Sequence, residues 1–218
     1  QAAVKTAGLE IGTLTLEPIA AINVLIPLTM RHLNLALVDV GAGTSDVAIT
    51  RQGSVIGYGM VPIAGDEITE ELSAKYLLDF KVAETVKRRL HRNSKSIAFT
   101  DVLGLKHSLP AKTLIKSIES VVTELAQAIA AQIMLLNQTA PQAVLLVGGG
   151  ALTPLLPEVL AEVMNLPKER VAVRRPDAIE DMLDIPADFC TPDAVTPLGI
   201  LKVAGAEALN FLNVVLNG

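Results

Sequence analysis

Aromatic residues and basic charge are scarce in this 218-residue sequence. It has no Trp, four Phe and two Tyr, yet half of its residues are hydrophobic. An aliphatic composition of this kind is typical of α/β proteins, in which strands rich in Val, Ile and Leu are covered by helices. The 18 basic residues are outnumbered by 23 acidic ones, so the sequence provides no general attraction to nucleic acid or anionic lipid.

The sequence has a single cysteine, Cys190, and three histidines, His32, His91 and His107. One thiol excludes an internal disulfide and a cysteine-rich zinc site, and it is consistent with a reducing cytoplasm. The histidines show no metal-binding spacing. No signal-peptide pattern opens the chain, and the longest apolar runs are too short or too interrupted by Gly and Pro to span a bilayer. We therefore expect a cytoplasmic protein.

Segments that alternate between strand and helix patterns flank a charged, mainly helical stretch. The sequence thus predicts an α/β fold in which residues 34–63 and 142–218 form one discontinuous subdomain. Residues 64–141 are expected to form an inserted α-rich subdomain. Residues 1–33 precede both and are expected to contribute a strand and a connecting helix.

Hydrophobic periodicity predicts the individual elements. Gln52-Gly53, between two β-type runs, indicates a hairpin turn, and Leu103–Leu109 has no clear pattern. The expected strands are Leu9–Leu16, Leu35–Val40, Val47–Arg51, Ser54–Val61, Ser96–Val102, Ala143–Val147 and Val171–Val173. The expected helices are Ile19–Leu28, Asp66–Asn93, Pro110–Asn137, Pro154–Met164 and Thr196–Leu212.

A loop rich in small residues, VDVGAGTSD, follows the expected strand Leu35–Val40. Its backbone N–H groups and hydroxyls can bind an anion. Asp39 would repel a phosphate unless a cation stood between them, so we interpret it as a ligand of Mg²⁺, directly or through water. The alternative is a tight hairpin in which Asp39 caps loop amides. The candidate phosphate-binding residues are Gly41, Gly43, Thr44 and Ser45.

A second glycine-rich motif, VLLVGGGALTPLLPEVL, reads as a strand, three glycines and the start of a helix. Gly148, Gly149 and Gly150 would let a ligand approach the backbone and leave the helix N-terminus facing negative charge. The alternative is a close-packed turn. Neither GxGxxG nor GxxxxGK[ST] occurs, which excludes the dinucleotide-binding fingerprint and the P-loop.

Charged residues at two helices complete the candidate site. Glu84, Lys87 and Arg88 are three and four residues apart on one expected helix and face the same side. The alternative for them is a solvated face with an internal ion pair. Glu17 precedes an expected helix, where a carboxylate is also a favourable cap.

Six segments in a fixed order resemble the actin-like ATPase superfamily, which includes actin, DnaK-type chaperones, MreB and FtsA. They are LEPIAA, LALVDVGAGTSDVAI, IAGDEITEEL, ETVKR, VLLVGGGALTPLLPEV and TPDAVTPLGILKVA. The resemblance is closest to FtsA-type cell-division proteins, with the PilM pilus-assembly group as a near neighbour. A DnaK-type chaperone is a weaker match because its substrate-binding domain is missing. The resemblance implies half of a ribonuclease H-like, actin-type fold: a mixed five-stranded sheet flanked by helices, with the α-rich insert.

The resemblance also implies a site for ATP and Mg²⁺. Glu17 would orient the attacking water, and Asp39 would hold the metal through water. The other implied roles are phosphate contact for Gly41, Gly43, Thr44, Ser45 and Gly65, ribose and purine contact for Glu84, Lys87 and Arg88, adenosine packing for Gly148, Gly149 and Gly150, and the adenine edge for Asp193. Ala42 and Ala64 stand where the family often has glycine, and each is tolerable only at a negative φ.

The family binds nucleotide between two halves, and only the second half is evident here. We therefore expect residues 1–33 to be the remnant of the first half, the full-length protein to be the ATPase, and this half to be inactive alone. Expected partners are ATP or ADP and either a second copy or a cytoskeletal or division protein. Alternatives are a PilM-like scaffold with weak or no ATPase and, more remotely, a sugar or acetate kinase. Residues 197–216 read as a helix covering the sheet, so membrane contact would be indirect and peripheral.

Overall fold

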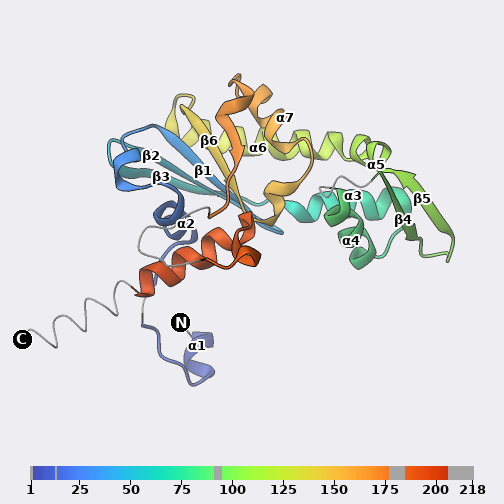
Figure 1. Ribbon diagram of the computed structural model, residues 1–218, viewed down its shortest axis with the longest axis horizontal. Helices are drawn as coiled ribbons and strands as arrows, with labels where there is room; N and C mark the ends of the chain where they lie inside the picture. The colour runs from blue at the N-terminus through green and yellow to red at the C-terminus, as the bar shows by residue number, and fades with distance from the viewer. Residues whose placement is uncertain (1, 13, 91–94, 177–184, 206–218) are drawn as a thin grey trace, which may run out of the picture.

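The computed structural model describes residues 2–12, 14–90, 95–176 and 185–205. They form a lobe built on a five-stranded sheet and a second lobe, made mainly of helices, beside it (Figure 1). The strand order is β3-β2-β1-β6-β7; β1, β2 and β3 are antiparallel, whereas β6 and β7 run parallel to β1. The mixed sheet of an α/β fold is confirmed. The strands are β1 (Leu35–Val40), β2 (Ser45–Arg51), β3 (Ser54–Val61), β6 (Ala143–Val147) and β7 (Val171–Val173).

The β2–β3 hairpin turns where the sequence indicates. Gln52 has φ 52° and Gly53 has φ 84°, and two successive positive φ values match the right-handed twist of the flanking strands. Gly53 N–H also donates to Arg31 O at 2.9 Å, which ties the turn to the segment before β1.

The sheet separates two hydrophobic cores. In β1, Ala36, Val38 and Val40 belong to one core, whereas Leu35 and Leu37 belong to the other, because successive side chains of a strand point to opposite faces. The first core also contains buried side chains of the second lobe. The helices over the first face are α6 (Glu119–Asn137) and α7 (Leu156–Val163), and those over the second are α2 (Glu17–Leu25) and the helix of residues 195–205.

The second lobe is reached from β3 and returns to the sheet through α6, which runs through both lobes (Figure 1). Its other elements are α3 (Gly65–Tyr76), α4 (Phe80–Leu90), β4 (Ser96–Thr100), β5 (Lys106–Pro110) and α5 (Ala111–Ser117). Among the described residues only α6 is long and apolar enough to cross a membrane. Its buried side chains, among them Val122, Leu125 and Ile129, pack in the first core, as in a core helix.

Two helical predictions need correction in this lobe. The stretch from Asp66 is divided because Leu77 adopts a left-handed φ of 52° and ends α3. The helix expected from Pro110 to Asn137 is broken at Ile118, whose φ of −101° and ψ of 1° lie outside the helical region. Ile118 is fully buried, so packing outweighs helical continuity there. The unassigned run Leu103–Leu109 contains the first four residues of β5, which pairs with β4.

The N-terminal strand prediction is wrong. The described residues of Leu9–Leu16 form no strand, and Leu9, Leu14 and Leu16 are exposed. A strand needs a hydrogen-bonding neighbour, and none of the described strands pairs with this run. The remaining short elements are α1 (Ala2–Thr6), η1 (Leu28–Met30), η2 (Gly149–Leu152), η3 (Lys168–Arg170), η4 (Ala187–Phe189) and η5 (Pro192–Ala194). His91, and residues 206–212 of the expected closing helix, lie outside the described residues.

Candidate functional site

A pocket of about 460 Å³ lies where the loop after β1 meets the second lobe, a size typical of small-molecule sites. It brings together seven of the residues expected from sequence, namely Gly41, Glu84, Lys87, Arg88, Gly149, Gly150 and Asp193. Ala42, Asp66, Leu152, Thr153, Asp188 and Thr191 complete its lining.

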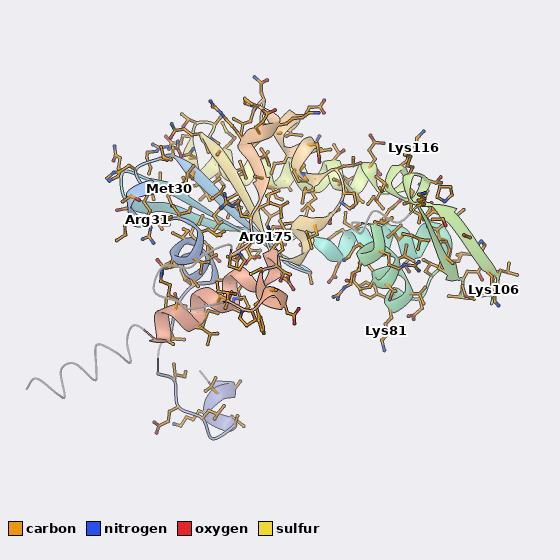
Figure 2. The ribbon with its side chains drawn as sticks, viewed as in Figure 1. Met30, Arg31, Lys81, Lys106, Lys116 and Arg175 are labelled. Atoms are coloured by element: carbon orange, nitrogen blue, oxygen red, sulfur yellow. The ribbon has the colours of Figure 1, made fainter. Side chains whose placement is uncertain are left out.

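Acidic side chains outnumber basic ones in this lining: four are acidic, Asp66, Glu84, Asp188 and Asp193, and two are basic, Lys87 and Arg88. Three other lysines of the second lobe, Lys81, Lys106 and Lys116, are exposed and point away from it (Figure 2). A polyanionic ligand would therefore need an accompanying cation.

The loop between β1 and β2 is bonded directly to the second lobe. Gly41 N–H donates to Thr44 O at 2.9 Å and closes the loop as a turn. The carbonyl of Gly41 accepts from Gly65 N–H (3.2 Å) and that of Ala42 from Asp66 N–H (2.8 Å). These are the first amides of α3, so the loop carbonyls cap the N-terminus of this helix and the two amides do not face the pocket. The loop and α3 thus form one hydrogen-bonded unit.

The two alanines at expected glycine positions introduce no backbone strain. Ala64 has φ −159°, and Ala42 is absent from the positive-φ residues of the described chain. Neither residue has the positive φ that would require glycine. The substitutions therefore leave the loop geometry intact.

A network of four side chains joins α3 to α4. Glu84 Oε2 lies 2.6 Å from Lys87 Nζ and accepts from Thr69 Oγ1 at 2.7 Å, while its Oε1 lies 2.8 Å from Arg88 Nε. Lys87 Nζ also donates to Gly65 O at 2.8 Å. The network therefore reaches from α4 to the residue that bonds the β1–β2 loop.

Burial alone would raise the pKa of Glu84, but hydrogen bonds from Lys87, Arg88 and Thr69 outweigh it and lower this pKa to about 2. The hydrogen bond to Glu84 raises the pKa of Arg88, and the negative charge of Asp193 acts in the same direction. Arg88 is thus within electrostatic range of the carboxylate expected at the adenine edge.

The three glycines after β6 have different surroundings. Gly148 has φ 84°, and a Cβ there would overlap Asp39 Oδ1 and Val40 O. A Cβ on Gly150 would overlap the Val40 side chain and Gly41 O, whereas one on Gly149 would meet nothing within 4 Å. Close packing between the two loops therefore requires Gly148 and Gly150, and only Gly149 offers free space.

Asp39 lies outside the pocket lining, on the α2 face of the sheet. Alternation along β1 places it on the side of Leu35 and Leu37, and it pairs with Asp46 across the β1–β2 ladder. Its Oδ2 accepts from Thr196 Oγ1 at 2.5 Å. Burial, and then the charge of Asp46, raise the pKa of Asp39, and the Thr196 hydrogen bond opposes this rise.

Glu17 is the first residue of α2 and is exposed. Tyr58 Oη donates to Asp46 Oδ1 at 2.8 Å. This hydrogen bond is the main reason that the pKa of Tyr58 is raised, and the charge of Glu17 contributes to the rise. Glu17 and Asp46 therefore share one negative region near Asp39.

The remaining expected residues lie around the loop. Gly43 and Thr44 are exposed at its tip. Ser45 is fully buried and donates to Ile63 O at 2.8 Å, so its hydroxyl is used within the protein. Gly65 lies next to the Lys87 side chain, because a Cβ on Gly65 would be 3.2 Å from Lys87 Nζ.

Among the described residues no group of three or more His, Cys, Asp or Glu side chains is arranged to hold a metal ion. Mg²⁺ is commonly held by one or two carboxylates together with water and substrate phosphates. A partly buried carboxylate beside a glycine-rich loop, as at Asp39, fits that mode of binding.

Several residues of the site were not singled out from the sequence. Thr69 and Thr196 lie within segments that carry the family resemblance, but only the fold shows that their hydroxyls bond Glu84 and Asp39. Asp188 lies in η4, in a segment without periodicity, and Thr191 lies directly before η5, at the start of the closing segment of the resemblance; both line the pocket. Thr153 lies three residues after Gly150 within the second glycine-rich motif, so its position was a weak signal for it.

Residues 36–197 match the family described as "Cell division protein FtsA". Over 214 residues the chain is 25% identical to cell division protein FtsA of Bacillus subtilis, which covers 94% of this chain and 46% of that protein. It is 33% identical to FtsA of Pseudomonas aeruginosa over 86 residues, 39% of this chain and 21% of that protein. The chain therefore spans at most about half the length of these relatives.

Solved structures show the same fold. The ethanolamine utilization protein EutJ of Carboxydothermus hydrogenoformans superposes with a TM-score of 0.62 at 25% identity, covering 90% of this chain and 57% of that one. A PilM–PilN type IV pilus biogenesis complex gives 0.64 at 22% identity, with 90% and 54% covered. MreB5 of Spiroplasma citri bound to ADP gives 0.69 at 17% identity, with 97% and 65% covered.

Proposed function

The chain belongs to the FtsA family of cell-division proteins and has the actin-like ATPase fold, and from this we propose that it forms one wall of a Mg-ATP site. In the full-length protein the nucleotide would lie between this wall and the other half of the molecule. Its state would control assembly or partner binding during cell division.

The pocket carries this proposal. Its size suits a nucleoside, and its excess of acidic side chains favours a nucleotide that arrives with a cation. The MreB5 structure is bound to ADP, which supports a nucleotide as the ligand of this fold. A neutral sugar would not explain why two basic and four acidic side chains line the same pocket.

Different residues of this wall would contact different parts of the nucleotide. Lys87 and Arg88 would meet the ribose and the purine, with Asp193 at the adenine edge, and Gly149 would give the adenosine free backbone to pack against. Gly41, Gly43 and Thr44 would contact the phosphates at the exposed loop. Ser45 and Gly65 would support that loop from beneath, since the structure uses their polar groups internally.

Asp39 would hold Mg²⁺ through water, and the cation would neutralise phosphate charge when bound. Glu17, exposed at the start of α2, would orient the water for in-line attack on the terminal phosphate. Both carboxylates lie outside the pocket on the α2 face of the sheet. A bound nucleotide would therefore extend from the pocket across the β1–β2 loop toward them.

Mg-ATP binding by the full-length protein tests the proposal. We expect Asp39→Asn to weaken Mg-ATP binding at least about tenfold, roughly 1.4 kcal/mol, and to leave ATP binding in EDTA nearly unchanged. Glu162→Gln is the matched control because it removes one negative charge from the exposed surface of α7. Equal Mg-ATP affinity in the wild type and Asp39→Asn would contradict the assignment.

A nucleotide-independent scaffold is the second candidate, and one observation favours it. The Glu84 carboxylate and the first amides of α3 are already satisfied within the protein, so this wall is stable without a ligand. ATP turnover that is lost in Glu17→Gln would support the enzyme. Assembly at the same rate with ATP, with ADP and without nucleotide would support the scaffold.

Family membership supports a proposal for the partners and the location. We propose self-association or binding to a division protein as the output, at the cytoplasmic side of the membrane. Membrane contact would be peripheral and would involve other parts of the full-length protein.

A further inference from the structure

We propose that Thr196 and Gly199 are positioning residues that set the placement of Glu17 relative to Asp39. The inference rests on the proposed function of those two carboxylates, and it concerns a helix that so far contributes to the site only the hydrogen bond from Thr196 to Asp39. The helix of residues 195–205 connects the two carboxylates through contacts one helical turn apart.

The first contact fixes Asp39. Thr196 Oγ1 donates to its Oδ2 at 2.5 Å across 157 residues of sequence, a short bond of the kind made to charged acceptors. The other oxygen, Oδ1, lies against Gly148 so closely that no Cβ fits there. The carboxylate is therefore held between a hydroxyl and a backbone, which leaves it little freedom to rotate.

The second contact fixes α2. A Cβ on Gly199 would overlap Ala20 O, so the two helices touch backbone to backbone at this point. Val195 and Leu198 are buried with Ala21 and Ile22 of α2 in the same core. The helix of residues 195–205 and α2 are therefore packed so closely that they move together.

The spacing of residues along each helix places the two contacts on neighbouring turns. Thr196 and Gly199 are three residues apart, and so are Glu17 and Ala20, which places each pair on one helix face. A chain of contacts therefore runs from Asp39 to Thr196 on one helix, and from Gly199 on that helix to Ala20 on α2. Glu17 lies one turn before Ala20. Lys202 Nζ adds a hydrogen bond to Asn23 O at 3.4 Å further along the same pair of helices.

Substitutions at the two contacts should have different effects on the full-length protein. Thr196→Val keeps the shape and removes the hydroxyl. Because the hydroxyl orients the carboxylate, we expect Mg-ATP affinity to fall about tenfold while ATP affinity in EDTA changes less than about threefold. Thr196→Ser should restore the Mg²⁺-dependent affinity. Thr123→Val is the control, because that hydroxyl donates to Glu119 O within α6.

Gly199→Ala should separate the helices while Asp39 stays in place. We expect nearly unchanged Mg-ATP affinity, a turnover number lowered about a hundredfold by the displaced Glu17, and faster hydrogen exchange at the start of α2. Gly205→Ala is the matched control, since a Cβ there would meet nothing within 4 Å. Hydrogen exchange reports the displacement independently of activity.

The outcomes separate this inference from the proposed function. A wild type that does not bind Mg-ATP would overturn the proposed function. A wild type that binds, with full Mg²⁺-dependent affinity in Thr196→Val or equal losses with Mg²⁺ and with EDTA, would overturn the positioning role of Thr196. Hydrogen exchange and turnover in Gly199→Ala that match those of Gly205→Ala would overturn the role of Gly199.

Discussion

Replacing the buried hydroxyl of Thr69 tests how α3 is joined to α4 within the second lobe. Thr69 is fully buried on α3, and its Oγ1 lies 2.7 Å from Glu84 Oε2 and 3.3 Å from Gly65 O. Its single proton serves the shorter contact, to the carboxylate. A hydrogen bond to a charged group contributes about 1.5–3 kcal/mol. Since Lys87 still holds Oε2 and valine buries an added methyl group, we expect Thr69→Val to lower the free energy of unfolding by about 1–2 kcal/mol.

Urea unfolding at pH 7 of the wild type, Thr69→Val, Glu84→Gln and the double variant measures this bond in a cycle. We expect a coupling of about 1 kcal/mol, because Thr69→Val should cost little once the carboxylate is gone. Thr85→Val is the control, since its hydroxyl is exposed and donates to Lys81 O within α4. Effects that add to within about 0.3 kcal/mol would refute the coupling between the two helices.

Two further predictions concern pH and the glycine motif. The Glu84 carboxylate has a lowered pKa of about 2 against an ordinary value of 4.5, so its stabilisation is present above pH 4.5 and is lost as the pH falls toward 2. Discounted for solvent screening, the loss is about 1–2 kcal/mol, and Glu84→Gln should show a smaller fall in urea midpoint between pH 5 and pH 3; equal falls would contradict it. Gly148→Ala should lower stability by about 2–4 kcal/mol through its positive φ and its overlap with Asp39. Gly149→Ala, which has free space, should melt close to the wild type, and equal melting of the two variants would count against the packing argument.

Local patterns predicted the sheet well. Leu35–Val38 and Ala143–Val147 are continuous apolar runs with side chains buried on both faces, and Gln52-Gly53 marks the hairpin turn. Local patterns failed where tertiary contacts determine the secondary structure. Nothing near Leu9–Leu16 shows whether a strand partner exists, and the break at Ile118 arises from burial.

The residues of the candidate site were likewise predicted where they form local motifs and missed where they depend on tertiary contacts. Glycine-rich loops and the charged face of α4 were visible as short motifs, and seven of the residues singled out for them or by the family resemblance meet in the pocket. Thr69 and Thr196 act across 15 and 157 residues, and a single hydroxyl has no local pattern. The separation of Asp39 from the pocket depends on which face of β1 it occupies and on how Gly148 packs against it.

The path of α6 through both lobes has a consequence for how the protein folds. A single hydrophobic core contains Val38 of the sheet, Ile68 and Phe99 of the second lobe and Ile129 of α6. The two lobes therefore have no boundary at which one could melt alone, and they should fold as one cooperative unit. Residues 64–141 excised by themselves would expose the sheet-facing side of α6 to water and aggregate.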